Sequence, residues 1–246
     1  MNIFKNIFAR IWALWGLLSF VATFGIIFLP SMASYLFTNH PKGQRYFIWI
    51  SKIWMRSWLT LIGCPLRITG LENFSPNQNF IVVFNHNSML DIPLSCPFVP
   101  GANKTIGKSS LSAIPIFGQF YKRGAVLVNR SDEKSRRKSY EMMKTVLQQG
   151  MHMCVYPEGT RNRTELLLKP FFDGAFKLSV DTRKKIIPCI ISGTKKASPI
   201  DRTFYLWPTG LRMHFLPSIA PEHYSVKELN HKVHEEMLKA IDRIGL

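Results

Sequence analysis

A run of 19 uncharged, mostly apolar residues near the N-terminus, "IWALWGLLSFVATFGIIFL" at 11–29, restricts what this chain can fold into. As an α-helix it would be about 28 Å long, close to the bilayer's hydrocarbon thickness of about 30 Å. We therefore expect a retained membrane anchor. The alternative is a signal peptide, with Lys5 and Arg10 as its basic start and "SMA" at 31–33 as its cleavage site. The apolar run is longer than the core of such peptides.

A second helix is predicted over residues 45–63, "RYFIWISKIWMRSWLTLIG". On a helical wheel Arg45, Lys52 and Arg56 share one narrow arc, which is typical of an interfacial helix whose cations reach lipid headgroups. Its tryptophans would then lie at the membrane boundary: Trp49, Trp54 and Trp58. The alternative is a core helix of a soluble protein. The two segments would form a helical hairpin in one leaflet, or one span plus a surface helix.

The net charge of +17 predicts an anionic partner, which would be nucleic acid, an acidic membrane or a phosphorylated substrate. The first 71 residues contain no Asp or Glu and hold five of the six tryptophans, and this composition favours a membrane lipid bilayer. Only 19% of the residues are charged and no nucleic-acid motif is visible, so we expect no nucleic-acid partner.

The four cysteines form no C-x-x-C pair and show no zinc spacing: Cys64, Cys96, Cys154 and Cys189. We expect reduced core residues in a catalytic domain that faces the cytoplasm, with no metal site.

From about residue 65 onwards, apolar strands alternate with amphipathic helices, which predicts an α/β domain with a layered sheet flanked by helices. We place the N-terminal membrane-associated helices at 1–63 and the α/β domain at 64–246. The predicted strands are 66–70, 79–84, 125–128, 153–157, 185–191, 203–207 and 211–216; the predicted helices are 131–149, 171–181 and 225–244. Ser225 and Glu228 form a capping box for the last helix.

A histidine and an aspartate five residues apart follow one of these strands, in "VVFNHNSMLDIP" at 82–93. In a continuous helix the two would point about 140° apart. The pair can therefore meet only if His86 lies in the turn after the strand and Asp91 in the first helical turn, where Pro93 is tolerated. Asp91 would then fix the imidazole tautomer and leave one nitrogen free as a base. The alternative is a capping aspartate beside a turn histidine.

Two further strands end in arginine-containing turns. In "YPEGTRNR", Gly159 permits close backbone approach, Thr160 offers a hydroxyl and Arg161 a phosphate-binding fork, while Glu158 could orient Arg161 or bind a substrate hydroxyl. An ordinary turn with a surface ion pair is the alternative. Arg130 follows the strand "AVLV".

Lys108 is another candidate cation, or else a solvated surface lysine. In a largely parallel sheet, the turns after its strands converge on one edge, so we expect His86, Arg130 and Arg161 to lie there together.

Four motifs together resemble the glycerolipid acyltransferases, the family of the 1-acyl-sn-glycerol-3-phosphate acyltransferases. "NHNSMLD" resembles N-H-x-S-x-x-D, and "YPEGTR" resembles F-P-E-G-T-R. "AVLVNR" and "IIPCIISGT" resemble the second and fourth motifs of the family, in its order and approximate spacing. The resemblance covers about residues 60–220. It implies a glycerol-3-phosphate acyltransferase-like fold, with the N-terminal helical segment associated with the membrane.

The resemblance also implies roles for individual residues. His86 would be the general base and Asp91 its partner. Three cations would bind the phosphate of lysophosphatidic acid: Arg130, Arg161 and Lys108. Three residues would position the substrate: Glu158, Gly159 and Thr160. The chain departs from the family pattern at Asn129, Asn162 and Asp173. These departures concern which headgroup the acceptor lipid carries and leave the His86–Asp91 pair unchanged.

The implied reaction is acyl transfer from a thioester of acyl carrier protein or coenzyme A to the sn-2 hydroxyl of 1-acyl-sn-glycerol 3-phosphate, which gives phosphatidic acid for phospholipid biosynthesis. Backbone N–H groups near the turn are candidates for stabilising the oxyanion, and no cofactor is expected. Ser88 is an alternative nucleophile, although we interpret it as a turn or cap residue. The alternatives are an acyltransferase for glycerol 3-phosphate or another lysolipid, a thioesterase, and a non-catalytic basic membrane-binding module.

Overall fold

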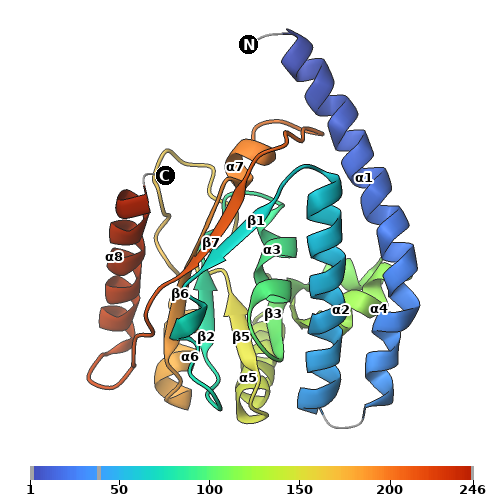
Figure 1. Ribbon diagram of the computed structural model, residues 1–246. Helices are drawn as coiled ribbons and strands as arrows, with labels where there is room; N and C mark the ends of the chain where they lie inside the picture. The colour runs from blue at the N-terminus through green and yellow to red at the C-terminus, as the bar shows by residue number, and fades with distance from the viewer. Residues whose placement is uncertain (1–2, 38–39, 245–246) are drawn as a thin grey trace.

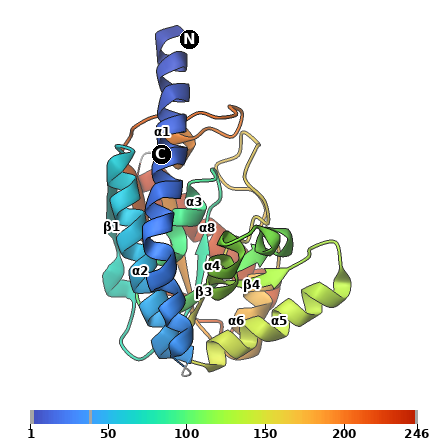
Figure 2. The ribbon, with the colours of Figure 1, turned by 90° about the vertical axis from the view of Figure 1, so that its right-hand side faces the viewer.

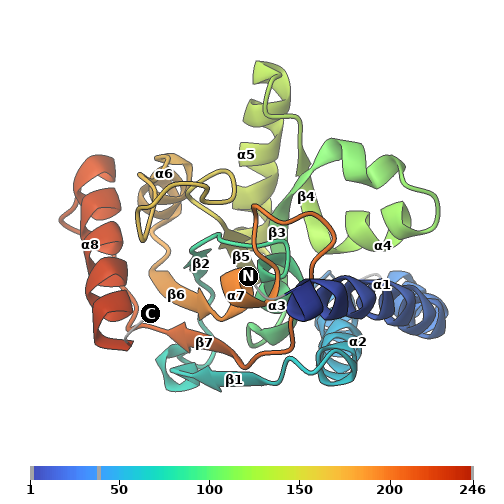
Figure 3. The same cartoon turned by 90° about the horizontal axis from the view of Figure 1, so that it is seen from above.

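The computed structural model describes residues 3–37 and 40–244, which form a seven-stranded sheet with helices on both faces (Figures 1 and 3). The strands are β1 (Leu66–Thr69), β2 (Ile81–Phe84), β3 (Asn103–Lys108), β4 (Ala125–Val128), β5 (His152–Val155), β6 (Ile186–Ser192) and β7 (Leu211–Phe215). The α-helices are α1 (Ile3–Met32), α2 (His40–Leu61), α3 (Asp91–Phe98), α4 (Phe117–Gly124), α5 (Glu133–Gln148), α6 (Gly174–Thr182), α7 (Thr194–Ala197) and α8 (Val226–Ile244). Short 3₁₀ helices cover Ala33–Leu36, Leu71–Asn73 and Ser109–Ala113.

The strand order is β1-β7-β6-β2-β5-β3-β4. The five strands from β6 to β4 are mutually parallel, whereas β7 pairs antiparallel with β6 and parallel with β1. The carboxyl ends of β2, β3, β4 and β5 therefore meet at one edge of the sheet. This confirms the largely parallel sheet on which the predicted convergence of the site residues depends.

The central strands are apolar without alternation because both faces of the sheet are covered. Along β2, Val82 and Phe84 belong to the apolar cluster under α2 and α3, and Ile81 and Val83 belong to the cluster under α5, α6 and α8. The predicted fold class is confirmed. The predicted strand at 203–207 is wrong: this segment is irregular, and Phe204 has φ 52°, a left-handed conformation that interrupts an extended chain.

α1 and α2 pack side by side (Figure 2); a hairpin in one leaflet and one span plus a surface helix both stay predictions. Trp54 and Trp58 of α2 are buried, and their indole N–H groups donate to the Thr23 hydroxyl and the Gly16 carbonyl of α1. The polar atoms of these two tryptophans are therefore satisfied between the helices; their place at the membrane boundary stays a prediction. Trp49 is exposed, as are the three cations of the predicted arc.

α1 presents a long apolar surface to the outside, including Leu14, Leu18 and Ile26. With the turn that follows it, this helix is long and apolar enough to cross a membrane, which agrees with membrane association. The division of the chain at residue 63 falls in the turn between α2 and β1. Two separate folding units remain a prediction.

Candidate active site

The site is built around His86, in the turn between β2 and α3. β2 ends at Phe84, α3 begins at Asp91, and Pro93 lies in its first turn. The predicted hydrogen bond is present: His86 Nδ1 lies 2.9 Å from Asp91 Oδ2. The histidine side chain is 12% exposed and the aspartate side chain is fully buried. The gap of five residues is thus spanned by a turn followed by a helix start.

One oxygen of Asp91 organises the whole turn. Besides the imidazole, Asp91 Oδ2 accepts the N–H groups of Asn87 at 2.6 Å and Ser88 at 2.7 Å. Charge-assisted hydrogen bonds of this kind are about twice as strong as neutral ones. Because Nδ1 faces the carboxylate, it carries the imidazole hydrogen, and Nε2 has no hydrogen-bond partner within residues 3–37 and 40–244. Nε2 is therefore the nitrogen that can accept a proton.

Glu158 holds this turn from the neighbouring strand. Its side chain is fully buried, Oε1 accepts the His86 N–H at 2.7 Å, and Oε2 accepts the Lys169 N–H at 3.2 Å. Burial raises the pKa of Glu158, and the two amide hydrogen bonds oppose that rise. Both carboxylate oxygens thus bind backbone N–H groups of the protein, and the predicted contact of Glu158 with the substrate stays a prediction. Through Oε1, Glu158 fixes the backbone of His86.

The N–H groups of His86, Asn87 and Ser88 all donate to carboxylates. They are therefore not available to an oxyanion, contrary to our expectation for the backbone of this turn. The Ser88 hydroxyl donates to the Ser198 carbonyl, which agrees with a turn residue better than with a nucleophile.

Arg130 links two of the predicted motifs. Its guanidinium donates a hydrogen bond to the Gly159 carbonyl, so the turn after β4 meets the turn after β5, two residues before Arg161. The guanidinium has five N–H donors, and this contact leaves several for a ligand. Arg161 is partly exposed and makes no side-chain hydrogen bond or ion pair in the described chain. Lys108 is exposed at the carboxyl end of β3, on the same edge.

Gly159 has φ +71°, and a Cβ built there would lie 2.7 Å from the Phe172 ring. This turn therefore requires glycine. Thr160 is exposed, and its hydroxyl accepts a hydrogen bond from Lys169 Nζ at 2.8 Å. Lys169 also reaches the carbonyls of Glu158 and Thr160.

The structure adds residues that the sequence patterns did not identify. The amide of Asn85 donates to the Ile191 carbonyl and accepts the Ile191 N–H, which ties the end of β2 to β6. The ring of Tyr156 lies 4.4 Å from that of His86 between centroids, and its hydroxyl donates to the Asp91 carbonyl. Burial and the nearby Asp91 raise the pKa of Tyr156. Lys169 gave no sequence signal, because only folding brings it over the turn.

The departures from the family pattern have structural roles of their own. The Asn162 N–H donates to the His86 carbonyl at 2.6 Å, and its side chain caps the turn at 164–166. Asp173 accepts a hydrogen bond from Asn230 of α8. Within the residues that the structure describes, no group of three or more His, Cys, Asp or Glu side chains is placed to hold a metal ion.

Comparison with known proteins agrees with this geometry. The acyltransferase family model matches residues 65–192, which contain every predicted site residue. A 1-acyl-sn-glycerol-3-phosphate acyltransferase of Cocos nucifera is 31% identical over 192 residues, 76% of this chain and 59% of that protein. A protein of the same name from Saccharomyces cerevisiae is 28% identical, covering 75% of this chain and 62% of its own length. The chain thus spans about three fifths of these relatives.

A solved structure shares the whole fold. The crystal structure of the 1-acyl-sn-glycerophosphate (LPA) acyltransferase PlsC from Thermotoga maritima superposes with a TM-score of 0.81 at 25% identity. The match covers 98% of each chain, so it includes the N-terminal helices as well as the sheet. With half of its length matched by the family model, this chain belongs to the acyltransferase family.

Proposed function

We propose that this protein transfers an acyl chain from a thioester of acyl carrier protein or coenzyme A to the sn-2 hydroxyl of 1-acyl-sn-glycerol 3-phosphate, giving phosphatidic acid. The observation that carries the proposal is the His86–Asp91 hydrogen bond, which directs Nε2 away from the carboxylate. Arg130 and Arg161 lie at the same edge of the sheet, in the turns after β4 and β5, and these turns meet through the Arg130–Gly159 hydrogen bond. The names of the relatives supply the acceptor.

In the proposed reaction, His86 Nε2 takes the proton of the sn-2 hydroxyl as its oxygen attacks the thioester carbonyl. The carbon–sulfur bond breaks, and the imidazolium returns the proton to the departing thiolate. Asp91 keeps the imidazole in one tautomer and stabilises its cation. General base catalysis of this kind contributes about 10²- to 10⁴-fold.

The acceptor's phosphate would bind Arg130 and Arg161, with Lys108 at the margin, since guanidinium groups match phosphate in geometry and charge. Fixing the phosphate would hold the hydroxyl near Nε2, which lowers the entropic part of the barrier. In this proposal the apolar surface of α1 lies in the membrane from which the lysolipid comes. The catalytic domain faces the cytoplasm, in agreement with four free cysteines.

The test is an acceptor-by-donor activity matrix on the purified protein. The acceptors are 1-acyl-sn-glycerol 3-phosphate, glycerol 3-phosphate and lysophosphatidylcholine; the donors are acyl-CoA and acyl carrier protein thioesters. We expect product only with the first acceptor, and a rate at least 100-fold lower for His86→Ala. Equal turnover of glycerol 3-phosphate would assign the other acceptor, and near-wild-type activity of His86→Ala would refute the mechanism.

A further inference from the structure

A second polar surface lies on β1 and β7, away from the His86 turn. Leu66 and Ile68 of β1 pack on the apolar cluster under α2. Side chains alternate along a strand, so Arg67 and Thr69 project from the opposite face. This face of β1 and β7 has no helix of the described chain over it; α8 reaches only its margin (Figures 1 and 3).

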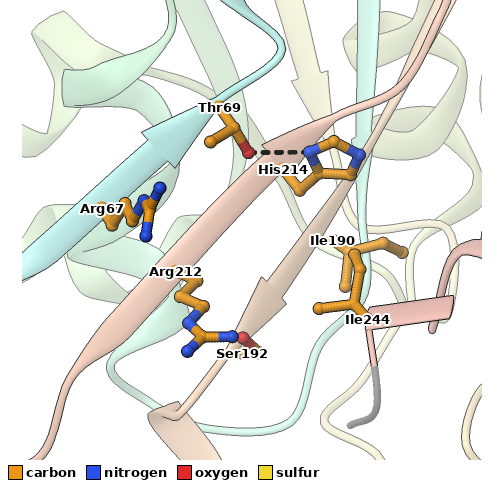
Figure 4. Close-up of a pocket in the computed structure, with 7 residues that line it drawn as sticks. All are labelled: Arg67, Thr69, Ile190, Ser192, Arg212, His214 and Ile244. Atoms are coloured by element: carbon orange, nitrogen blue, oxygen red, sulfur yellow. Dashed lines mark hydrogen bonds between the residues drawn. The ribbon is translucent and has the colours of Figure 1, made fainter. Parts of the chain in front are cut away.

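The pairing register turns this face into two rows. Arg67 of β1 pairs with Arg212 of β7, which pairs with Ser192 of β6. In the next row, Thr69 pairs with His214, which pairs with Ile190. With Ile244 at the end of α8, these six residues line a cavity of about 190 Å³ (Figure 4).

The two arginines occupy paired positions without a counter-charge in the described chain; both are exposed, and the Arg212 side chain extends toward Ser192 (Figure 4). Neither Arg67 nor Arg212 forms an ion pair or a side-chain hydrogen bond within residues 3–37 and 40–244. Like charges directly opposite each other on paired strands are destabilising. Two guanidinium groups held at paired positions over an open cavity therefore form an arrangement that an anion would stabilise.

The other polar groups of the cavity extend this arrangement. Thr69 Oγ1 lies 2.7 Å from His214 Nδ1, as the dashed line in Figure 4 shows. In the tautomer in which the hydroxyl donates to Nδ1, the imidazole carries its hydrogen on Nε2, which can then donate to a ligand. Ser192 adds a hydroxyl beside the end of the Arg212 side chain (Figure 4).

We propose that this cavity binds a phosphoryl group, at a site separate from the candidate active site. Its donors come from three strands, which suits the several oxygens of a phosphate better than the two of a carboxylate. The cavity is smaller than the roughly 300–1,000 Å³ of pockets that enclose whole ligands. It holds one phosphoryl group, either of a soluble phosphate or of an anionic lipid headgroup. The inference does not depend on the proposed reaction.

Because the active-site arginines would also bind phosphate, the test uses the full chain carrying Arg130→Gln and Arg161→Gln, in neutral detergent at constant ionic strength. Titration calorimetry with inorganic phosphate is expected to show binding in this protein. Adding Arg67→Gln and Arg212→Gln should weaken that binding at least 10-fold. Adding Arg137→Gln and Lys138→Gln on α5, which removes the same charge, should leave it unchanged.

A second arm separates the two sources of phosphate. Monomeric dihexanoyl phosphatidate is compared with dihexanoyl phosphatidylcholine in the same proteins. Binding of phosphatidate alone assigns a lipid headgroup, and binding of both inorganic phosphate and phosphatidate assigns a general phosphoryl site. Binding of neither, or equal weakening by the α5 control, overturns the proposal.

Thermal unfolding without phosphate provides a folding check. Replacing the two paired arginines should leave Tm unchanged or raise it, because two like charges on adjacent strands are removed. A clear fall in Tm for Arg67→Gln/Arg212→Gln relative to the α5 control would mean that these side chains already have stabilising partners, which would also overturn the proposal.

Discussion

Two histidines on adjacent strands have opposite surroundings. His86 follows β2 at the carboxyl edge of the sheet, with one nitrogen on Asp91 and the other unbonded in the described chain. His152 begins β5 at the amino edge, where Nδ1 accepts the Phe80 N–H at 3.0 Å and the ring donates to the Pro100 carbonyl. Its ring stacks on Phe80 with 5° between the planes.

The difference shows what makes an imidazole a base. Burial lowers the pKa of His152 to about 4, because no carboxylate compensates for the lost hydration, so this ring stays neutral at physiological pH. His86 has a carboxylate on one nitrogen and an open second nitrogen. The contacts of the ring, rather than the residue type, separate a core histidine from a proton carrier.

The largest expected effect comes from exchanging each histidine for glutamine. His86→Gln should lower the rate of acyl transfer by about 10²- to 10⁴-fold with little change in Tm. His152→Gln should cost about 1–3 kcal/mol of unfolding free energy, since buried groups lose hydrogen bonds, and should keep the rate per folded molecule. Steady-state rates and urea unfolding of both variants measure this. An equal loss of rate in His152→Gln would break the comparison.

Asp91→Asn should have the next largest effect, about 10²-fold on kcat, because the carboxylate that fixes the imidazole and stabilises its cation is lost. Asp132→Asn is the matched control. Asp132 also accepts two backbone N–H groups, at the start of α5, and contacts no base. It should leave both stability and kcat nearly unchanged, because Asn caps a helix about as well as Asp. Wild-type kcat in Asp91→Asn would show that His86 acts without its carboxylate.

The pH dependence of the unfolding free energy tests whether His152 stays neutral in the folded protein, unlike an exposed histidine. The pKa of His152 is about 4 when folded against 6.5 unfolded, so below pH 6.5 the unfolded chain takes up the proton first. Stability is complete above pH 6.5 and falls as the pH drops toward 4. Between pH 7 and pH 5 this group should cost about 2 kcal/mol, roughly 30-fold in the unfolding constant.

Urea unfolding of the wild type and His152→Gln at both pH values measures this difference. The wild type should lose more stability than the variant by that amount. Equal losses would mean that His152 titrates normally in the folded protein.

Glu158→Gln should have the smallest effect, about 10-fold on kcat with little change in KM. The altered group is the acceptor that holds the His86 backbone, so the change acts through the position of His86. Glu165→Gln, an exposed position on the following loop, is the control and should leave both constants unchanged. A rise in KM for the acceptor without a fall in kcat would return Glu158 to a substrate-binding role.

Much of the fold and part of the site were predictable from local patterns. Buried parallel strands appear in the sequence as short apolar runs. The spacing of His86 and Asp91 excluded a continuous helix between these two residues. Contacts between distant segments were not predictable. The burial of Trp54 and Trp58 depends on α1, and the pairing of Arg67 and Arg212 depends on a register between strands far apart in the chain.

The error at 203–207 has a similar cause. The segment has the composition of a strand, but its backbone is used elsewhere: the Leu206 N–H donates to the Ala9 carbonyl, and the Trp207 N–H donates to the Ala197 carbonyl. The residues next to 203–207 in the sequence do not reveal these hydrogen bonds to distant segments. For the same reason the two amide partners of Glu158 could not be predicted from the sequence.

The bond between Ala9 and Leu206 also has a consequence for how the protein is made. α1 is synthesised before the sheet, yet the segment that bonds to Ala9 is synthesised only after six of the seven strands. Throughout that interval α2 is the segment available to cover α1, and the apolar surface that α2 leaves open favours aggregation on a growing chain. Early delivery of the nascent chain to a lipid surface would protect the helix while the sheet is still incomplete.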